Sequence, residues 1–488
     1  MKNISNTELA KSIINVGFDR STLDTKIIHL GFGAFHRAHQ CLYTSELSRT
    51  TGSDWGICEV NLFGGEELVK QLRDQQHLYS VLEKGATAST VKISGAIVDA
   101  LQPNLDGIQT IIEKMSEPQI SVVTMTITEK GYCADIQSGK LDTNNPLIKH
   151  DLANPSQPQS AIGYIVEALR TRKERGLPAF TVLSCDNLQN NGHLTQQVVS
   201  EYVQSIDTEL ASWISENVTF PCSMVDRISP AITSDDQKEM AELLGVDDPC
   251  GVVCEPFRQW IIEDNFVNGR PEWDKVGAQF VDNVIPFEQM KLRMLNGSHS
   301  FLAYLGYLGG FDYISEAMAN ADYRQATIEL MVQEQSKTLN MPAGVDLQQY
   351  AEQLIERFSN TSLQHRTWQI AMDGSQKLPA RFCESLLVLR ENKLTSKWLP
   401  LGIAAWIKYV SQTDESGNAI DVRDPLIEEF TRIYAQSLSP QETVMAFLNI
   451  STIFGTQLIE DTELVEQIIT AYKSLLSLGA KATIKSFL

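Results

Sequence analysis

The sequence lacks the features that would place the protein in a membrane or outside the cell. Its 488 residues contain no run of 18 or more apolar residues, so no transmembrane helix is predicted. The stretch MKNISNTELAKSIINVGF at its start has no apolar core followed by a small-residue cleavage site, so export is not expected. Low-complexity tracts and internal repeats are also missing. These absences predict a globular protein of the cytoplasm without a membrane partner.

Positive charge is scarce. The chain has 40 Lys and Arg against 61 Asp and Glu, which gives a net charge of −21. Because nucleic-acid binding rests on clustered Lys and Arg, a nucleic-acid partner is not expected. An anionic substrate would need a local basic island within this repulsive overall field.

Paired cysteine motifs are missing as well. The eight cysteines are scattered, and several lie in apolar runs such as WGICEV and FTVLSCDN, which favours reduced core thiols in a cytoplasm. Cys250 and Cys254 have no second pair that would complete a zinc site. No metal is therefore predicted.

The pattern of apolar residues changes near residue 286. The first part has four apolar strand candidates, at residues 26–35, 54–62, 120–128 and 178–187. They alternate with helical patterns, which predicts βαβ units and a parallel-rich sheet that the runs 250–257 and 278–287 could extend. The second part has apolar spacings of three and four, which predict helices. We expect an α/β Rossmann-like domain over 1–285 and a mostly α-helical domain over 286–488.

A glycine turn follows the first strand candidate, in IIHLGFGAFHRAHQ. In a dinucleotide fold, the glycine at Gly31 would allow the tight turn, and that at Gly33 would let a pyrophosphate approach the backbone. The third glycine is absent, because position 36 is His. Any strand-ending turn could use this pattern, but its place at the first βα junction favours a dinucleotide. His36 and His39 could be metal ligands, or could line the cleft, which we favour because no carboxylate follows at ligand spacing.

Acidic residues follow the second strand candidate. An acid there would bind the ribose hydroxyls of NAD and repel the extra phosphate of NADP. Glu59, Glu66 and Glu67 are all candidates, and solvated acids at a helix start are the alternative.

Polar residues also end two later apolar runs. Asp186 and Asn187 follow one of them, and Asp226 and Arg227 follow the other. The carboxyl ends of strands are where ligands bind in such sheets. A turn residue at Asn187 and a structural ion pair between Asp226 and Arg227 are the alternatives.

The segment KLRMLNGSHS places Lys291, Asn296 and His299 in a predicted helix. On a continuous α-helix, Asn296 and His299 would lie about 140° and about 80° round from Lys291. A solvated helix face is one interpretation. The apolar neighbours indicate partial burial instead, and buried polar groups need partners that a substrate could supply.

Lys291, Asn296 and His299 match the K-x5-N-x2-H signature of the polyol-specific long-chain dehydrogenases/reductases, the mannitol dehydrogenase family. The blocks GFGAFHRAHQ, TEKGY, SCDNLQNNG, EPFRQWIIEDNF and IPFEQMKLRMLNGSHS resemble that family across nearly the whole chain. HRTWQIAMDGSQKLPAR most resembles its fructuronate reductase branch, an activity of hexuronate catabolism.

The resemblance implies an NAD-dependent, zinc-independent oxidoreductase. It gives Lys291 the general acid/base role, and Asn187 and Asn296 the role of amides that hold the reacting oxygen. His299 and Asp226 match substrate-binding positions, and Glu288 matches an acid that gates proton exit. The cofactor-binding positions that it implies are Ile28, His29, Leu30, Gly31, Phe32, Gly33, Ala34, Phe35, His36, Glu66 and Glu129.

The residue types suit this chemistry. Hydride transfer to a ketone builds negative charge on its oxygen, which amide N–H groups stabilise, and a buried Lys can deliver the proton. A uronate also needs a cation for its carboxylate; Arg366, Lys377 and Arg381 are candidates, with surface charges as the alternative. We expect reversible reduction of D-fructuronate to D-mannonate by a monomer or weak dimer. The alternatives are a mannitol-type polyol dehydrogenase, a tagaturonate reductase and a dinucleotide sensor without turnover.

Overall fold

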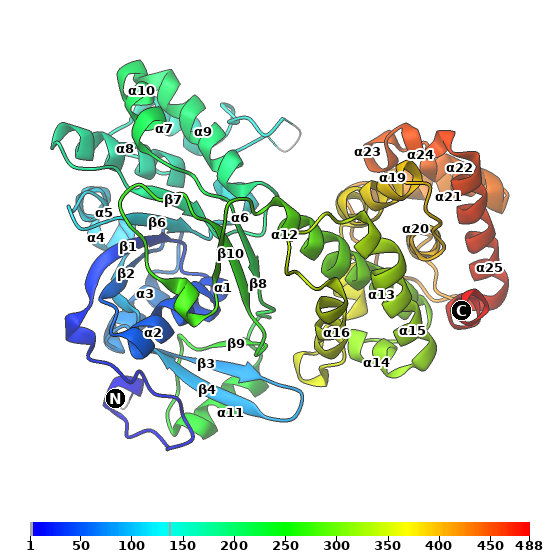
Figure 1. The fold of residues 1–488 in the computed structure, drawn as a ribbon, viewed down its shortest axis with the longest axis horizontal. Helices are drawn as coiled ribbons and strands as arrows, with labels where there is room; N and C mark the ends of the chain where they lie inside the picture. The colour runs from blue at the N-terminus through cyan, green and yellow to red at the C-terminus, as the bar shows by residue number, and fades with distance from the viewer. Residues whose placement is uncertain (1–2, 136–137) are drawn as a thin grey trace. The chain divides into compact units, whose positions relative to one another are not determined.

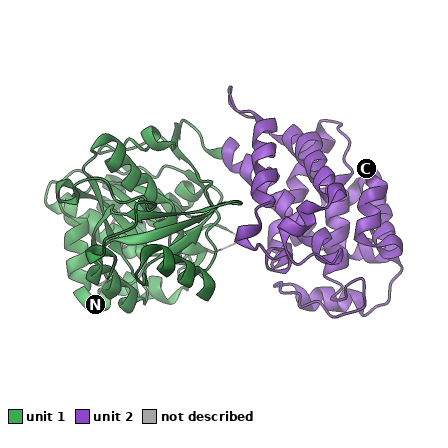
Figure 2. Ribbon diagram, turned by 90° about the horizontal axis from the view of Figure 1, so that it is seen from below, with its two compact units in different colours: residues 1–285 green, residues 286–488 purple. Residues whose placement is uncertain are grey.

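The computed structural model describes residues 3–135 and 138–488 of the chain. Clustering of contacts divides the chain into two compact units, Met1–Ile285 and Pro286–Leu488 (Figure 2). None of the described helices combines the length and the hydropathy that a membrane crossing requires.

A parallel five-stranded sheet forms the centre of the first unit (Figure 1), in the order β5-β2-β1-β6-β7. Its strands are β1 (Asp24–Leu30), β2 (Trp55–Val60), β5 (Ile97–Leu101), β6 (Val122–Met125) and β7 (Thr181–Ser184). The chain runs from β1 outward to β2 and β5, then returns to β6 on the other side of β1. The strand order therefore reverses between β1 and β6, which is where ligands bind in open α/β sheets.

Apolar residues on both faces of this sheet explain its parallel pairing. Ile28 and Val123 pack into the core under α5 (Ile108–Met115), α8 (Ala161–Glu174) and α9 (Asn191–Ile206). Ile27 and Val122 pack into the core that includes α2 (Gln40–Thr51) and α3 (Glu66–Asp74). Adjacent strand residues point to opposite faces, so a run of apolar residues needs helices on both sides. The prediction of a Rossmann-like α/β domain is confirmed.

Two small sheets complete the strands of this unit. One has the order β4-β3-β9, and the other β11-β10-β8. Their strands are β3 (Tyr79–Lys84), β4 (Ser89–Ser94), β8 (Ser223–Asp226), β9 (Val252–Cys254), β10 (Gln259–Glu263) and β11 (Gln279–Val281). The expectation that runs 250–257 and 278–287 extend the main sheet was wrong: β9 pairs with β3, and β11 pairs with β10.

The helices of the first unit begin at side-chain caps in several places; Ser160 and Asp207, for example, accept hydrogen bonds from the first turns of α8 and α10. These helices are α1 (Ala34–Ala38), α2 (Gln40–Thr51), α3 (Glu66–Asp74), α4 (Pro103–Asp106), α5 (Ile108–Met115), α6 (Thr128–Gly131), α7 (Pro146–Ala153), α8 (Ala161–Glu174), α9 (Asn191–Ile206), α10 (Thr208–Asn217) and α11 (Ser234–Leu244), with 3-10 turns at Ile4–Asn6, Arg20–Thr22 and Trp273–Val276.

The second unit is helical, as predicted, and no strand is assigned in its described residues. Its helices are α12 (Ile285–Met290), η4 (Lys291–Gly297), α13 (Ser298–Leu308), α14 (Ile314–Ala319), α15 (Ala321–Glu329), η5 (Leu330–Glu334), η6 (Gln335–Thr338), α16 (Leu347–Phe358), η7 (Thr361–Leu363), α17 (Thr367–Ala371), α18 (Gly374–Leu378), η8 (Pro379–Cys383), α19 (Glu384–Glu391), α20 (Trp398–Tyr409), α21 (Ile427–Tyr434), α22 (Pro440–Leu448), α23 (Ser451–Phe454), α24 (Gln457–Glu460) and α25 (Thr462–Phe487).

Helix α20 lies at the centre of this second unit. It packs against α13 and α25, and its apolar side chains are fully buried. Trp406 makes edge-on contacts with Phe430, Phe447 and Phe454. A helix that is apolar all round requires a complete shell of other helices, which explains the all-helical architecture.

Candidate active site

The turn after β1 lies where the sheet reverses its strand order. Gly31 has φ +112°, and a Cβ added there would lie 2.2 Å from the carbonyl oxygen of Thr126, directly after β6. Both the backbone conformation and this close approach require glycine. Gly33 begins α1 and has open space around its Cα, because no atom lies within 4 Å of an added Cβ. The turn therefore presents backbone rather than side chains at the place where a dinucleotide binds.

The predicted cofactor residues divide into buried and accessible ones. Ile28 and Leu30 are fully buried in the core, and the ring of His29 is hydrogen-bonded to the hydroxyls of Thr124 and Thr126. Their side chains therefore serve the fold. Phe32 and His36 are also buried, whereas Gly31, Ala34 and Phe35 are partly exposed and Gly33 and Glu129 are exposed.

The acids after β2 have different surroundings. Glu59 is fully buried within β2, with its Oε1 2.5 Å from Nε2 of His36. Glu66 is the first residue of α3 and is only half-buried. Its carboxylate accepts a hydrogen bond of 2.7 Å from Nδ2 of Asn104, and this bond lowers the pKa of Glu66. Glu66 is therefore accessible to a ligand, and Glu67 beside it is exposed, while Glu59 is occupied inside the fold.

His29, His36 and Glu59 form a buried group whose potential metal-ligand atoms lie within 4.8 Å of one another. The two imidazole rings are stacked, with centroids 3.3 Å apart and planes 9° apart. An imidazole binds a metal in the plane of its ring, so an ion in the plane of one ring would lie well outside the plane of the other. One ion shared by both rings does not fit this geometry.

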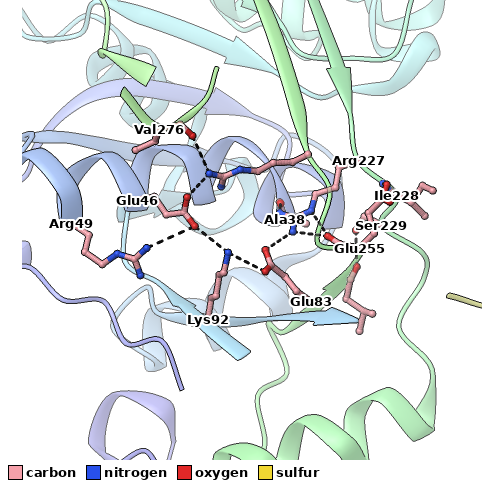
Figure 3. Close-up of polar contacts among 12 residues, drawn as sticks. Ala38, Glu46, Arg49, Glu83, Lys92, Arg227, Ile228, Ser229, Glu255 and Val276 are labelled. Carbon is pink, nitrogen blue, oxygen red and sulfur yellow. Dashed lines mark hydrogen bonds and ion pairs between the residues drawn. The ribbon is translucent and has the colours of Figure 1, made fainter. Parts of the chain in front are cut away.

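Asp226 is the last residue of β8 and is buried. Arg227 forms a structural ion pair whose partner is Glu83, whereas the predicted alternative paired it with Asp226: its buried guanidinium contacts the carboxylate of Glu83 (Figure 3). It also donates to the carbonyl oxygens of Ala38, at 2.6 Å, and Glu255, at 2.9 and 2.6 Å. Arg227 thus joins the end of β8 to α1 and β3, which fixes the backbone that carries Asp226.

Further charges extend this network away from Arg227. The ammonium of Lys92 lies 3.0 Å from Glu83 and 3.2 Å from Glu46 (Figure 3). Glu46 also pairs with Arg258. Because positive and negative groups alternate within partly buried surroundings, each carboxylate has a cationic partner.

The segment KLRMLNGSHS differs from its prediction in one respect. Residues Lys291–Gly297 form a π-helix, not part of a continuous α-helix. Since a π-helix closes its backbone bonds from i to i+5, residues five apart lie one turn apart. Lys291 and Asn296 therefore lie on one face, and the angle of about 140° expected for an α-helix does not apply. Lys291 is buried, and so is Glu288, which lies on the preceding helix α12.

His299 is the second residue of α13, the α-helix that follows. Its ring stacks on Phe358, with centroids 5.1 Å apart, and lies 5.5 Å from the ring of His365. Its buried Nε2 has no hydrogen-bond partner among the described residues. Burial, and then the nearby His365, Arg381, Arg357 and Lys377, hold the pKa of His299 well below its usual range. A neutral imidazole with an unsatisfied buried nitrogen is suited to hydrogen-bond a polar ligand.

Two of the three predicted carboxylate-binding cations lie near His299. Arg381 donates to Oγ of Ser300, at 2.8 Å, and to the carbonyl oxygen of Asn296, at 3.3 Å. The ammonium of Lys377 donates to two backbone carbonyls, and burial together with Arg381 lowers its pKa to about 8. Arg366 is instead exposed, with its guanidinium 5.8 Å from the centre of the Tyr313 ring.

Sequence reasoning did not single out His365 and Arg357 as part of this group. Burial and Arg357 lower the pKa of His365 to about 4, so this imidazole is neutral too. His365 lies in the block HRTWQIAMDGSQKLPAR, directly before Arg366, and this position was the feature of the sequence that could have indicated a place in the site. Arg357 lies in an amphipathic helix, α16, whose pattern alone predicts a solvated charge.

Comparison with known proteins covers both units. Residues 25–275 match the mannitol dehydrogenase Rossmann domain, and residues 283–476 match the mannitol dehydrogenase C-terminal domain. The chain is 57% identical to D-mannonate oxidoreductase of Escherichia coli (strain K12) over 95% of this chain and 96% of that one. It is 36% identical to mannitol 2-dehydrogenase of Aspergillus terreus, over 96% of this chain and 94% of that one.

A solved structure agrees with these matches. Mannitol 2-dehydrogenase of Pseudomonas fluorescens, in a ternary complex with NAD and D-mannitol, aligns with a TM-score of 0.83 at 36% identity. The alignment covers 98% of this chain and 97% of that one. The chain therefore belongs to the mannitol dehydrogenase family of oxidoreductases.

Proposed function

We propose that the protein is an NAD-dependent oxidoreductase that interconverts D-fructuronate and D-mannonate. The observation that supports this substrate is the cationic group of Lys377, Arg381 and Arg357 around His299, in a chain whose net charge is −21. A mannitol-type substrate has no charge that would need such a group, whereas a uronate has one carboxylate. The relative at 57% identity is a D-mannonate oxidoreductase, in agreement with this choice.

The first unit is proposed to bind the cofactor. The turn from Gly31 to Phe35 offers backbone to the pyrophosphate, Glu66 accepts hydrogen bonds from the ribose hydroxyls, and Glu129 lies after β6 on the same edge of the sheet. A carboxylate at Glu66 repels a 2′-phosphate, which favours NAD over NADP. When bound, NADH supplies the hydride that reduces the ketone carbon.

The proton and the developing charge are assigned to side chains of the chain. Lys291 gives a proton to the carbonyl oxygen as the hydride reaches the carbon, and takes it back in the reverse direction. The amides of Asn187 and Asn296 donate hydrogen bonds to that oxygen while it is negatively charged. His299, as a neutral imidazole, binds a hydroxyl group of the sugar, and so does Asp226. Glu288 gates the return of the proton to solvent.

The substrate assignment is tested by NADH oxidation with fructuronate, tagaturonate and fructose. We expect kcat/KM for fructuronate to exceed that for fructose by at least about a hundredfold. Fructose has no carboxylate, so it cannot form the buried charge pair with the cationic group. Equal values for the two would overturn the proposal. A higher value for tagaturonate would reassign the enzyme to the other hexuronate.

The Arg381→Met variant tests the cationic group itself. It should raise KM for fructuronate at least tenfold and leave KM for fructose within about threefold. Arg293→Met is the matched control, since Arg293 is also buried in this unit and also donates to a backbone carbonyl, that of Thr338. A similar rise in KM in both variants would indicate a general loss of packing.

A polyol dehydrogenase is the second candidate, supported by the mannitol 2-dehydrogenases at 36% identity. Oxidation of mannitol at a rate comparable to that of mannonate would favour it. NADH binding without turnover of any hexuronate or polyol would favour a dinucleotide sensor. The proposal includes a monomer or weak dimer in the cytoplasm, which light scattering and cell fractionation test.

A further inference from the structure

Two loops meet beside the glycine turn, at the carboxyl edge of the main sheet. One follows β6 at residues 126–131 and includes the single turn of helix α6, and the other follows β7 at residues 185–190. Strands β6 and β7 are parallel neighbours, with Met125 opposite Ser184, so the two loops leave the sheet side by side. Asn187, a proposed oxyanion donor, belongs to the second loop.

The carboxylate of Asp186 joins these loops. It accepts hydrogen bonds from the backbone N–H of Ile127, at 2.9 Å, and of Thr128, at 3.0 Å. A third bond, of 2.8 Å, comes from the hydroxyl of Tyr132. Three donors on one largely buried carboxylate form a strong, directional clamp on the first loop.

The clamped residue has an unfavourable backbone conformation. Thr128 has φ +61°, a region that β-branched residues rarely adopt. Its side chain is exposed, so packing of that side chain does not hold the conformation. The hydrogen bonds that Asp186 accepts from the backbone N–H groups of Ile127 and Thr128 are the observed interactions that offset the strain. Strained residues of this kind concentrate at ligand sites.

The position of the clamp relates it to the cofactor. The loop after β6 begins at Thr126, whose carbonyl oxygen fits against Gly31 at the reversal of the strand order. Glu66 lies after β2, on one side of that reversal, and is the residue proposed to bind the ribose of the adenosine half. The other half of a dinucleotide that crosses the edge then extends toward the loops after β6 and β7.

We propose that Asp186 is a positioning residue, which holds Thr128 and Glu129 in the left-handed turn that contacts the nicotinamide half of the dinucleotide. The inference rests on the proposed use of NAD but not on the identity of the sugar. The carboxylate acts through the loop and does not itself touch the cofactor.

The test measures the Kd of NADH by its fluorescence, together with the thermal midpoint of each variant. Asp186→Asn keeps the size of the side chain but removes its charge and one acceptor, and should raise Kd about tenfold. Adding Thr128→Gly should restore Kd to within about threefold of wild type, since glycine adopts the turn without a clamp. A purely structural role of Asp186 would not be rescued by a glycine in an exposed loop.

Asp151→Asn is the matched control. Asp151 is also buried and accepts hydrogen bonds from two backbone N–H groups, those of Gln159 and Ser160, and from the hydroxyl of Ser160, but it lies in α7 and holds the start of α8. This variant should lower the thermal midpoint and leave Kd unchanged. If Asp186→Asn behaves in the same way, or if Thr128→Gly does not restore binding, the inference is overturned.

Thr128→Pro tests the loop with Asp186 intact, in case Asp186→Asn does not fold. Proline fixes φ near −65°, so the turn cannot form, and Kd should rise at least tenfold. An unchanged Kd would contradict the inference. A wild-type protein that does not bind NADH would overturn the proposed function, whereas binding without fructuronate turnover would overturn the substrate alone.

Discussion

Lys291 and Asn296 lie one helical turn apart, on the same face of the π-helix Lys291–Gly297. An α-helix would place residues five apart on different faces. The wide turn thus places an ammonium and an amide along one line of the second unit, and π-helical turns occur frequently at functional sites.

The proposed acid/base role of Lys291 gives the first prediction. Lys291→Ala should lower kcat with fructuronate by about 10²–10⁴, because general acid/base catalysis contributes that much, while the Kd of NADH stays unchanged. Stopped-flow kinetics and NADH titration measure the two effects. A variant with wild-type kcat would exclude Lys291 as the proton donor.

The lowered pKa of Lys377 predicts a pH dependence of substrate binding. Its ammonium is charged below a pKa of about 8 and neutral above it, so the attraction for a carboxylate is lost as pH rises. KM for fructuronate should increase about tenfold from pH 7 to pH 9, whereas KM for fructose should not follow this curve. In Lys377→Arg the increase should disappear, because a guanidinium stays protonated throughout this range. A pH profile identical to wild type in that variant would show that another group titrates.

The close approach of Gly31 to Thr126 predicts the effect of a methyl group. Gly31→Ala would bring a Cβ to 2.2 Å from a carbonyl oxygen, so the turn must move, and NADH binding should weaken by at least tenfold. Gly52→Ala is the matched control, since Gly52 also has positive φ but has no atom within 4 Å of an added Cβ. The control should lose about 1 kcal/mol of unfolding free energy and keep its Kd for NADH. Equal binding by the two variants would contradict the role of the turn.

The buried contact between Arg227 and Glu83 predicts a large effect on stability. Arg227→Met should lower the free energy of unfolding by about 3–5 kcal/mol, because Glu83 loses a buried partner and three hydrogen bonds to backbone carbonyls disappear. Arg175→Met removes an exposed pair with Glu113 and should cost at most about 1 kcal/mol. Chemical denaturation of both variants measures the difference. Similar losses would show that Arg227 contributes no more than a surface charge.

Local sequence patterns were sufficient to predict most of the fold. Strands β2, β6 and β7 lie within three of the predicted apolar runs, and β1 overlaps the run 26–35 but begins two residues before it. Burial on both faces leaves a recognisable stretch of β-branched residues in such strands. Strand β5 escaped prediction; it lies at the edge of the sheet, and two of its five residues, Val98 and Asp99, are only partly buried. The runs placed wrongly, 250–257 and 278–287, are strands in small sheets; an apolar run alone does not specify which strand it pairs with.

The candidate site was predictable only where its residues follow a local motif. Gly31, Asn187, Asp226, Lys291 and His299 each stand at the end of a strand or within a recognisable segment. His365 and Arg357 join His299 through the packing of separate helices, and no spacing in the chain predicts such a contact. The proposed role of Asp186 likewise depends on hydrogen bonds from Ile127 and Thr128, which lie 59 and 58 residues away in the chain.

The sequence by itself determined the alternation of strands and helices, the helical second unit and the glycine that the first turn needs, because these depend on local periodicity and backbone sterics. Only the tertiary structure decided the π-helix that aligns Lys291 with Asn296. Gly297 ends that helix against Gln335 and the carbonyl oxygen of Arg381, which an added Cβ would meet at 2.6 and 3.1 Å. Gln335 and Arg381 lie about 40 and 85 residues after Gly297 in the chain, so the wide turn is accompanied by packing against distant segments. Local propensity alone would have favoured an ordinary α-helix.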